Sequence, residues 1–220
     1  MRLAVENLSG ERGGEAVFSD ISFALDAGQA LLVTGPNGAG KSTMLRIVAG
    51  LLPAAEGRVA FSGSGEFPDI RAASHYLGHL NAMKPALSVE ENLAFWRDFL
   101  GSPRLSPRDA LDMVGLGEIG HLPFGYLSTG QRRRASIARL IVSYRPVWLL
   151  DEPTAGLDRA SEDRFAQLMR GHLAEGGIIV AATHLPLGLE GTRELRMGEE
   201  MLGAPGERAK GRGVSGGSAI

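Results

Sequence analysis

The sequence predicts an α/β fold, and three apolar runs are the main reason. Val147–Leu150 and Ile178–Ala182 are apolar at every position, which is typical of strands covered on both faces of a sheet. Ala30–Val33 is a third such run, and a glycine-rich loop and a helical pattern follow it. These runs predict a mixed sheet core. The rest of the chain adds an antiparallel β region at the N-terminus and an inserted helical subdomain.

The first third of the chain is rich in strand signals, with turn residues between the apolar stretches. Gly10, Gly13 and Gly14 are expected to form the turn that joins the first two strands. Beyond the glycine-rich loop, a helix is expected to begin near Lys41 and to end at Gly50. The other strands of this region are expected at Leu3–Leu8, Phe18–Leu25, Gly57–Phe61 and residues 75–80.

The middle of the chain is predicted to be a helical insertion over about residues 86–126. Ser88, with Glu91 three positions later, forms a capping-box pattern that starts its first helix. Aromatic residues follow at helical spacing, at Phe95, Trp96 and Phe99. Two interpretations of this aromatic face stay open. It packs the core of the insertion, or it lines a groove that receives a helix of a partner protein.

The last third returns to alternating helix and strand. Further helices are expected from Ser106 to Val114, from Ser128 or Gly130 to about Val142, and over Ala160–Ala174. The arginines at 132–134 are expected on a solvated helix face. Residues 1–202 are predicted to form one domain, and residues 203–220, rich in glycine, serine and charge, a disordered tail.

Composition excludes several classes of function. The formal net charge of −2 gives no general attraction to nucleic acid or to an anionic membrane surface. The absence of cysteine excludes disulfides and thiolate metal sites. No stretch approaches about 18 uninterrupted apolar residues, and the N-terminus lacks the apolar region of a signal peptide. We therefore expect no nucleic-acid partner and no transmembrane segment, so any role at a membrane requires partners.

Residues 35–43 carry the strongest motif. Their letters, GPNGAGKST, match the G-x-x-x-x-G-K-[ST] pattern between a strand and a helix. Glycines allow successive backbone N–H groups to turn toward an anion, and the helix N-terminus points its positive dipole end at the same place. Lys41 should reach the β- and γ-phosphates of a nucleotide, and the Ser42 hydroxyl should ligate Mg²⁺. The expected nucleotide-binding residues of this loop are Gly35, Pro36, Asn37, Gly38, Ala39, Gly40, Lys41, Ser42 and Thr43.

Polar residues at strand and helix ends are candidates for the chemistry. Asp151 follows an apolar strand, where a carboxylate can orient Mg²⁺ directly or through its water. Glu152 can accept a proton from the attacking water, or polarise it. His184 follows the next apolar strand and can hydrogen-bond a γ-phosphate. Ser128 and the Gly130 amide lie where a helix N-terminus can bind an anion.

Together these motifs resemble the nucleotide-binding subunits of ATP-binding-cassette (ABC) transporters, which are P-loop NTPases. The resemblance runs from Leu3 to about Met197 and implies one ABC ATPase domain over residues 1–202, with ATP and Mg²⁺ as cofactors. The motifs occur in the family's order: Walker A at Gly35–Thr43, the signature LSTGQ at Leu127–Gln131, Walker B at Val147–Glu152, the D-loop AGLD at Ala155–Asp158, and the switch histidine at His184.

The resemblance implies a mechanism that needs two copies of the chain. The copies pair head to tail as a homodimer, and each ATP lies between Walker A of one copy and the signature of the other. Glu152 and His184 are the implied catalytic residues. The second copy is expected to contribute Ser128, Gly130, Gln131 and Asp158. A monomer should therefore hydrolyse ATP poorly, because its site is incomplete.

Two positions depart from the family's pattern. Where the family has a glutamine that contacts Mg²⁺ and the water, the sequence has His79, and Asn81 is the alternative replacement. The aromatic residue that usually stacks on adenine falls at Arg12. An arginine plane can also stack on a base, and Phe18 is the second candidate.

Within the family, the chain resembles the ATPases of the heme exporter complex of cytochrome c maturation. The segment HYLGHLN at residues 75–81, the arginines after LSTGQ, and Pro186 after the switch histidine carry this resemblance. It implies integral membrane permease subunits as partners and a peripheral position at the cytoplasmic face of the bacterial inner membrane. Hydrolysis would then drive the release of a heme-loaded chaperone. The alternatives are the ATPase of another exporter, for a lipid, a drug or another small molecule, and a soluble ABC ATPase that acts on ribosomes or DNA.

Overall fold

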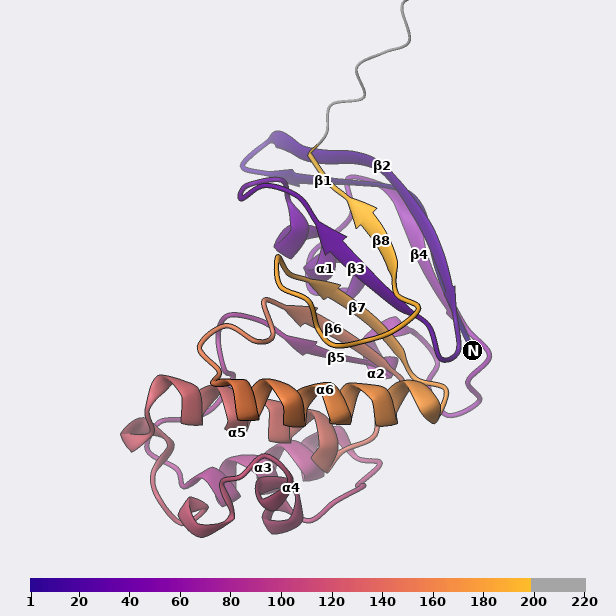
Figure 1. Cartoon of the computed structure of the whole chain (residues 1–220). Helices are drawn as coiled ribbons and strands as arrows, with labels where there is room; N and C mark the ends of the chain where they lie inside the picture. The colour runs from indigo at the N-terminus through magenta and orange to yellow at the C-terminus, as the bar shows by residue number, and fades with distance from the viewer. Residues whose placement is uncertain (199–220) are drawn as a thin grey trace, which may run out of the picture.

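The structure, a computed structural model, describes residues 1–198 and is built in layers (Figure 1). A three-stranded antiparallel sheet lies on one side, a five-stranded parallel sheet forms the centre, and helices cover the far face. The predicted α/β class is confirmed, with antiparallel and parallel pairing divided between two sheets. The tail predicted for residues 203–220 and the domain end at 202 lie outside the described residues.

The sheets have the strand orders β2–β1–β4 and β5–β6–β7–β3–β8, and every pairing in the second is parallel. The three apolar runs of the sequence form its three inner strands, as predicted. The strands of the antiparallel sheet are β1 (Arg2–Arg12), β2 (Glu15–Asp26) and β4 (Glu56–Ser62). Those of the parallel sheet are β3 (Ala30–Thr34), β5 (Ser74–Leu77), β6 (Val147–Asp151), β7 (Ile178–Ala182) and β8 (Arg193–Arg196).

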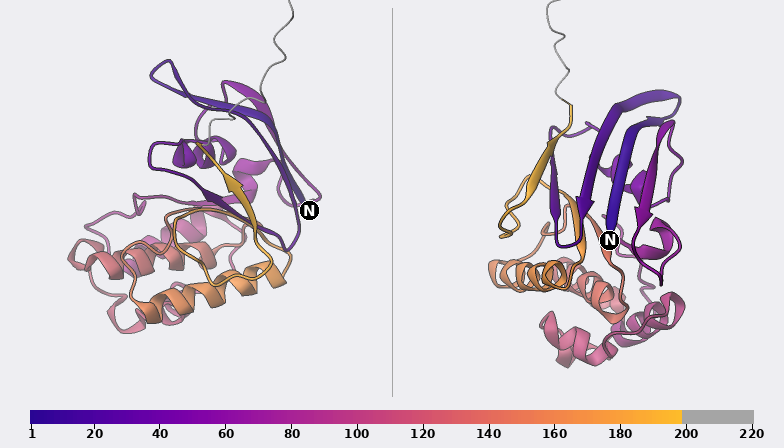
Figure 2. Two further views of the ribbon diagram at one scale, coloured as in Figure 1. Left: turned by 45° about the horizontal axis from the view of Figure 1, so that its top comes forward. Right: turned by 90° about the vertical axis from the view of Figure 1, so that its right-hand side faces the viewer.

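The helices separate into a group at the sheets and a group at the far end of the molecule (Figure 2). They are α1 (Lys41–Val48), α2 (Ile70–Ala73), α3 (Val89–Leu100), α4 (Pro107–Met113), α5 (Thr129–Val142) and α6 (Arg159–Ala174), with 3₁₀ turns at Gly117–Ile119 and Phe124–Tyr126. The predicted capping box starts α3, because Ser88 and Glu91 bond each other's backbone N–H groups. Within residues 1–198, no helix combines the length and the hydropathy that a membrane span requires.

Helix α1 joins the two sheets through a shared apolar core. Its side chains Met44, Leu45 and Val48 are fully buried against residues of both sheets. The other face of the parallel sheet packs against α5 and α6. Helices α3 and α4 of the insertion pack in turn against α5 (Figure 1). Helix α1, which follows the phosphate loop at residues 35–40, is therefore held between the two sheets.

The first turn differs from the prediction at Gly10. Gly10 lies inside β1, and the turn is formed by Gly13 and Gly14, both with positive φ. A Cβ at Gly10 would lie 2.4 Å from the ring of Phe18, so glycine is needed there for close packing and not for a turn.

Two elements, α2 and β8, had no prediction. The β8 sequence RELR has no apolar pattern, because the strand lies at the edge of the sheet beside β3 and is largely exposed. Helix α2 is a single turn, which Asp69 caps by accepting a hydrogen bond from the Ala72 N–H. Neither element offers the periodicity on which a sequence-based assignment depends.

The aromatic face of α3 points away from the core. Leu93 is fully buried, but Phe95 is 47% exposed and Phe99 is 69% exposed. The two rings stack with centroids 5.7 Å apart, and Trp96 packs edge-on against both. The interpretation that this face packs the core of the insertion is therefore wrong for Phe95 and Phe99.

Two histidines are buried far from the phosphate loop. The His75 ring donates its Nε2 proton to the Ser143 carbonyl at 2.9 Å, and burial together with Arg139 lowers its pKa to about 3. His172 stacks on Trp148 with ring centroids 4.1 Å apart, and burial lowers its pKa to about 4. Both rings are therefore neutral in the folded protein at neutral pH.

We predict that these histidines make the protein lose stability as the pH falls from about 6.5 toward 4. In this range the unfolded chain binds protons that the folded chain excludes, so the free energy of unfolding decreases by up to about 1.4 kcal/mol per pH unit for each histidine. Urea unfolding at pH 7.5 and pH 5 measures the loss. His75→Gln should reduce the difference between the two pH values, while His121→Gln, at an exposed position, should leave it unchanged. Equal pH dependence in all three proteins would contradict the assignment.

Candidate active site

Parallel strand pairing brings three distant segments to one edge of the sheet. Strand β7 pairs with β3 on one side and with β6 on the other, and Ala182 is the register partner of both Val33 and Asp151. The carboxyl ends of these strands therefore lead together into the phosphate loop, into Asp151 and Glu152, here called the acid pair, and into His184. Ligands of open α/β sheets bind at such an edge.

The phosphate loop depends on glycines that no other residue can replace. Gly35 has a φ of +130°, and a Cβ there would lie 2.1 Å from the Met197 carbonyl oxygen. Gly40 has a φ of +89°, and a Cβ would lie 2.8 Å from Val17 Cγ1. Gly40 is also the N-cap of α1, and no side chain among the described residues caps this helix. Its first N–H groups are thus free to bind an anion.

Lys41 lies folded over the loop. Its Nζ donates to the carbonyls of Gly35 at 2.6 Å and Pro36 at 3.0 Å, and it lies 3.2 Å from His184 Nε2. Because an ammonium group can only donate, Nε2 accepts and the His184 proton is on Nδ1. A phosphate in the loop would offer charged acceptors, which bind an ammonium group more strongly than carbonyls do.

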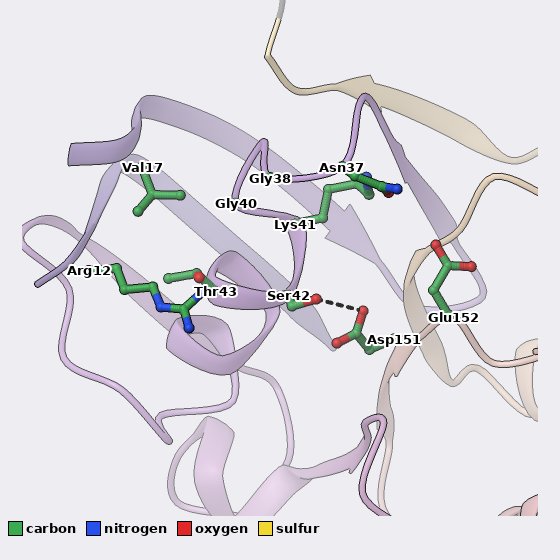
Figure 3. A pocket seen from close by; sticks show the side chains of 10 residues that line it. All are labelled: Arg12, Val17, Asn37, Gly38, Gly40, Lys41, Ser42, Thr43, Asp151 and Glu152. Atoms are coloured by element: carbon green, nitrogen blue, oxygen red, sulfur yellow. Dashed lines mark hydrogen bonds between the residues drawn. The ribbon is translucent and has the colours of Figure 1, made fainter. Parts of the chain in front are cut away.

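Asp151 is fixed from both sides. Its side chain accepts a hydrogen bond from Ser42 Oγ at 3.0 Å on Oδ1 (Figure 3) and one from the Tyr76 hydroxyl at 3.2 Å on Oδ2. Arg46 Nε in turn donates to the Tyr76 oxygen at 3.2 Å. Burial raises the pKa of Tyr76, so the hydroxyl keeps the proton that it donates.

Glu152 has a left-handed backbone, with a φ of +44°. Its N–H donates to the Ala182 carbonyl at 2.8 Å, which ties it to the end of β7. Its Oε1 lies 3.9 Å from His184 Nε2, and both side chains are partly open to solvent. The two predicted catalytic side chains are thus neighbours, with the Lys41 ammonium group beside His184.

A cleft of about 260 Å³ opens beside the phosphate loop (Figure 3). Its lining residues are Arg12, Val17, Asn37, Gly38, Gly40, Lys41, Ser42, Thr43, Asp151 and Glu152. Arg12, predicted to stack on adenine, lies in this lining at the end of β1. Phe18, the alternative, is only 9% exposed and packs into the core.

A second cavity of about 560 Å³ shares Ser42, Asp151 and Glu152 with the first. Both candidates for the missing glutamine, His79 and Asn81, line it. The Asn81 amide oxygen accepts a hydrogen bond from Ser136 Oγ at 2.9 Å on helix α5, whereas the His79 side chain is exposed.

The structure does not bring the signature residues to the phosphate loop of the same chain. Ser128 and Gln131 form a capping box at the start of α5. Gly130 lies close to Gly156 of the D-loop, because a Cβ there would be 3.1 Å from the Gly156 carbonyl oxygen. Asp158 caps α6 by accepting a hydrogen bond from the Ser161 N–H at 2.8 Å, and this bond lowers the pKa of its carboxyl group.

The oxygen atoms of Ser42 and Asp151 fit a magnesium site. Mg²⁺ prefers oxygen ligands and is usually bound by one or two protein groups together with phosphate oxygens and water. Asp151 is 7% exposed and its carboxylate faces the Ser42 hydroxyl, so the pair can hold a cation beside phosphates bound in the loop.

Sequence reasoning missed Tyr76, Arg46 and Arg133. Tyr76 lies one strand away from Asp151, and no motif marks it. Arg133 was expected on a solvated helix face, but it is only 6% exposed and donates hydrogen bonds to the backbone beside the acid pair. A signal was present in the pattern, since the apolar stripe of α5 continues on the same side of the helix at Ile137.

Comparison with known proteins agrees with this geometry. The sequence profile of the family described as "ABC transporter" matches residues 18–155. The chain belongs to the ABC transporter family and is an ATPase of this type, with a site that binds ATP.

Curated relatives from three bacteria share one name within this family. The "Cytochrome c biogenesis ATP-binding export protein CcmA" of Chelativorans sp. (strain BNC1) is 79% identical over 90% of this chain and 98% of its own length. The proteins of the same name from Mesorhizobium japonicum and Brucella abortus are 72% and 62% identical, over 90% and 87% of this chain and 98% and 89% of their own lengths.

Solved structures share the fold. The ATP-binding subunit of an ABC transporter aligns with a TM-score of 0.79 at 25% identity, over 90% of this chain and 86% of that one. A bacterial Atm1-family ABC exporter with ATP bound aligns with a TM-score of 0.73 at 26% identity, over 90% of this chain and 37% of that one.

We predict that Lys41→Ala lowers the affinity for ATP by about 10- to 100-fold, because the variant loses a charged hydrogen-bond donor to the phosphates. Equilibrium binding of ATP to the purified chain measures the change. Lys84→Ala, which removes a lysine outside the cleft, is the control and should bind ATP as the parent does. Equal affinities for both variants would rule out the phosphate contact.

Proposed function

We propose that this chain is the ATP-hydrolysing subunit of a membrane export complex in cytochrome c biogenesis. Hydrolysis would drive the export of heme or the release of a heme-loaded chaperone. The hydrogen bond between Ser42 and Asp151 is the main support for hydrolysis, because it joins the phosphate loop to the acid pair. The names of relatives at 62–79% identity support the biological setting.

Each residue at the edge of the sheet has a role in this proposal. The loop amides and the N-terminus of α1 bind the phosphates, and Lys41 moves from the loop carbonyls to the β- and γ-phosphates. Glu152 accepts a proton from the attacking water or polarises it. His184 donates a hydrogen bond to the γ-phosphate, once its Nε2 carries the proton and Lys41 has turned away. Arg12 stacks on the base.

Mg²⁺, held by Ser42 and Asp151, would supply charge stabilisation for the phosphoryl transfer. His79 and Asn81 both line the second cavity with this pair, and of the two we assign His79 to the position of the family's glutamine. Asn81 is less free to move, because Ser136 holds its amide oxygen.

A second copy of the chain completes the site. The position of Ser128, Gly130 and Gln131 at the start of α5, outside the cleft of their own chain, supports this proposal. Ser128 caps the Gln131 N–H at this helix N-terminus, so the amides of Thr129 and Gly130 are the ones that suit a γ-phosphate presented by the partner copy. Asp158, at the adjoining start of α6, would lie at the same interface.

Integral membrane permease subunits are the other proposed partners, and the chain would lie at the cytoplasmic face of the bacterial inner membrane. The stacked pair Phe95 and Phe99 supports this, because exposed aromatic side chains next to each other mark an interaction surface. Leu80, which is 83% exposed, lies in the loop that carries His79. A partner helix bound there would touch both the insertion and the site loop.

We predict that Glu152→Gln retains ATP binding and loses hydrolysis by at least about 100-fold, because the variant lacks the proton acceptor. Release of phosphate and equilibrium binding of ATP measure the two properties. Glu56→Gln, at an exposed position on β4 outside the cleft, is the control and should hydrolyse ATP normally. Hydrolysis by Glu152→Gln at the parental rate would refute the assignment of the base.

The same Glu152→Gln protein, purified from detergent-solubilised membranes, should carry integral membrane proteins with it. Adding Phe95→Ser and Phe99→Ser should reduce this recovery several-fold, because the aromatic surface is removed while the cleft is left intact. Quantitative mass spectrometry of the purified complex measures the recovery. Ribosomal proteins in place of membrane proteins would overturn the proposed setting.

A further inference from the structure

Arg133 is a buried cation in the second turn of α5, the helix that begins at the signature segment. It is 6% exposed, and among the described residues no carboxylate pairs with it at salt-bridge distance. Burial lowers the pKa of the guanidinium group, whereas the negative charges of Asp151 and Glu152 raise it. A buried charge without an ion-pair partner is costly unless hydrogen bonds replace its hydration.

Four backbone carbonyls take the place of that hydration. Arg133 Nε donates to Pro153 at 2.9 Å, and Nη2 donates to Asp151 at 3.0 Å and Glu152 at 2.6 Å. Nη1 donates to Gly78 at 2.8 Å, the residue before His79. Four of the five N–H donors of the guanidinium group are therefore used on two segments of the active site.

The carbonyl of Glu152 belongs to a strained residue. Glutamate rarely adopts a positive φ, and such a backbone costs about 1–2 kcal/mol unless the surroundings hold it. Here the N–H of Glu152 donates to the Ala182 carbonyl on β7, and the Glu152 carbonyl accepts from Arg133 Nη2 on α5 and, at 3.2 Å, from the Ala155 N–H. The direction of the Glu152 side chain follows from this conformation, because φ sets where Cβ points.

We propose that Arg133 is a positioning residue for hydrolysis. It holds the left-handed backbone of Glu152 so that the carboxylate faces the γ-phosphate. The inference rests on the proposed role of Glu152 as the base. The hydrogen bond from Arg133 also joins α5 to the backbone of Glu152. A shift of α5, which begins at the signature segment, would therefore move the Glu152 carbonyl.

Kinetics of the full chain test the proposal with Arg133→Lys and Arg133→Gln. Lysine keeps the charge and glutamine keeps an amide donor, but neither can span four carbonyls in two segments. Both variants should lower kcat at least 10-fold and keep the dissociation constant of ATP within about two-fold. Arg145→Lys is the matched control, since Arg145 is also 6% exposed and donates to the backbone carbonyls of Leu100 and Tyr144, away from the cleft. It should keep the parental kcat.

A double-mutant cycle with Glu152→Gln separates positioning from a structural role. If Arg133 acts through Glu152, adding Arg133→Lys to Glu152→Gln should lower the residual rate by less than two-fold. A full additional 10-fold loss would overturn the proposal, as would parental kcat in both single variants. Failure of both variants to fold, seen as thermal unfolding below the assay temperature, would assign Arg133 a structural role and overturn it too. If instead Glu152→Gln itself hydrolyses ATP normally, the proposed base fails, which is a distinct result.

Discussion

The parallel pairing of β6, β7 and β3 is the constraint on which the rest of the site depends. Because the three strands are in register, the chain leaves the sheet at neighbouring points after Thr34, Asp151 and Ala182. The phosphate loop, the acid pair and the switch histidine are up to about 150 residues apart in sequence. They meet because each directly follows one of these paired strands. The Ser42–Asp151 hydrogen bond joins them across the sheet edge. A shift of β6 by one residue would turn Asp151 to the opposite face.

Short-range patterns predicted most of this arrangement. The inner strands, the phosphate loop and the capping box of α3 follow from apolar runs and from residue spacings along the chain, which act over a few residues. The residues that were missed depend on contacts across the sheet. Tyr76 reaches Asp151 only because β5 pairs with β6, and Arg133 is buried only because α5 packs on the acid-pair loop. The edge strand β8 has no apolar pattern, since solvent covers most of its side chains.

The aromatic residues of α3 show the limit of periodicity. Phe95 and Phe99 have the spacing of a core-facing stripe, but Leu93 and Val89 already fill the core side of the helix. Helical spacing tells which side chains share a face, and it does not tell whether that face meets the core or a partner. A similar limit applies to Ser128 and Gln131, whose capping box stabilises α5 whether or not the helix end also binds a phosphate of a second copy.

The central claim is that the cleft is half of an ATP site and that a second copy completes it. The chain has no cysteine, so an engineered pair can report this contact directly. Asn37→Cys in the phosphate loop and Ser128→Cys at the start of α5 would be combined in the Glu152→Gln chain, which we expect to retain ATP. With ATP and Mg²⁺ under oxidising conditions, we expect a covalent dimer, and either cysteine alone should give none. A chain that stays monomeric with ATP bound and both thiols accessible would contradict the account.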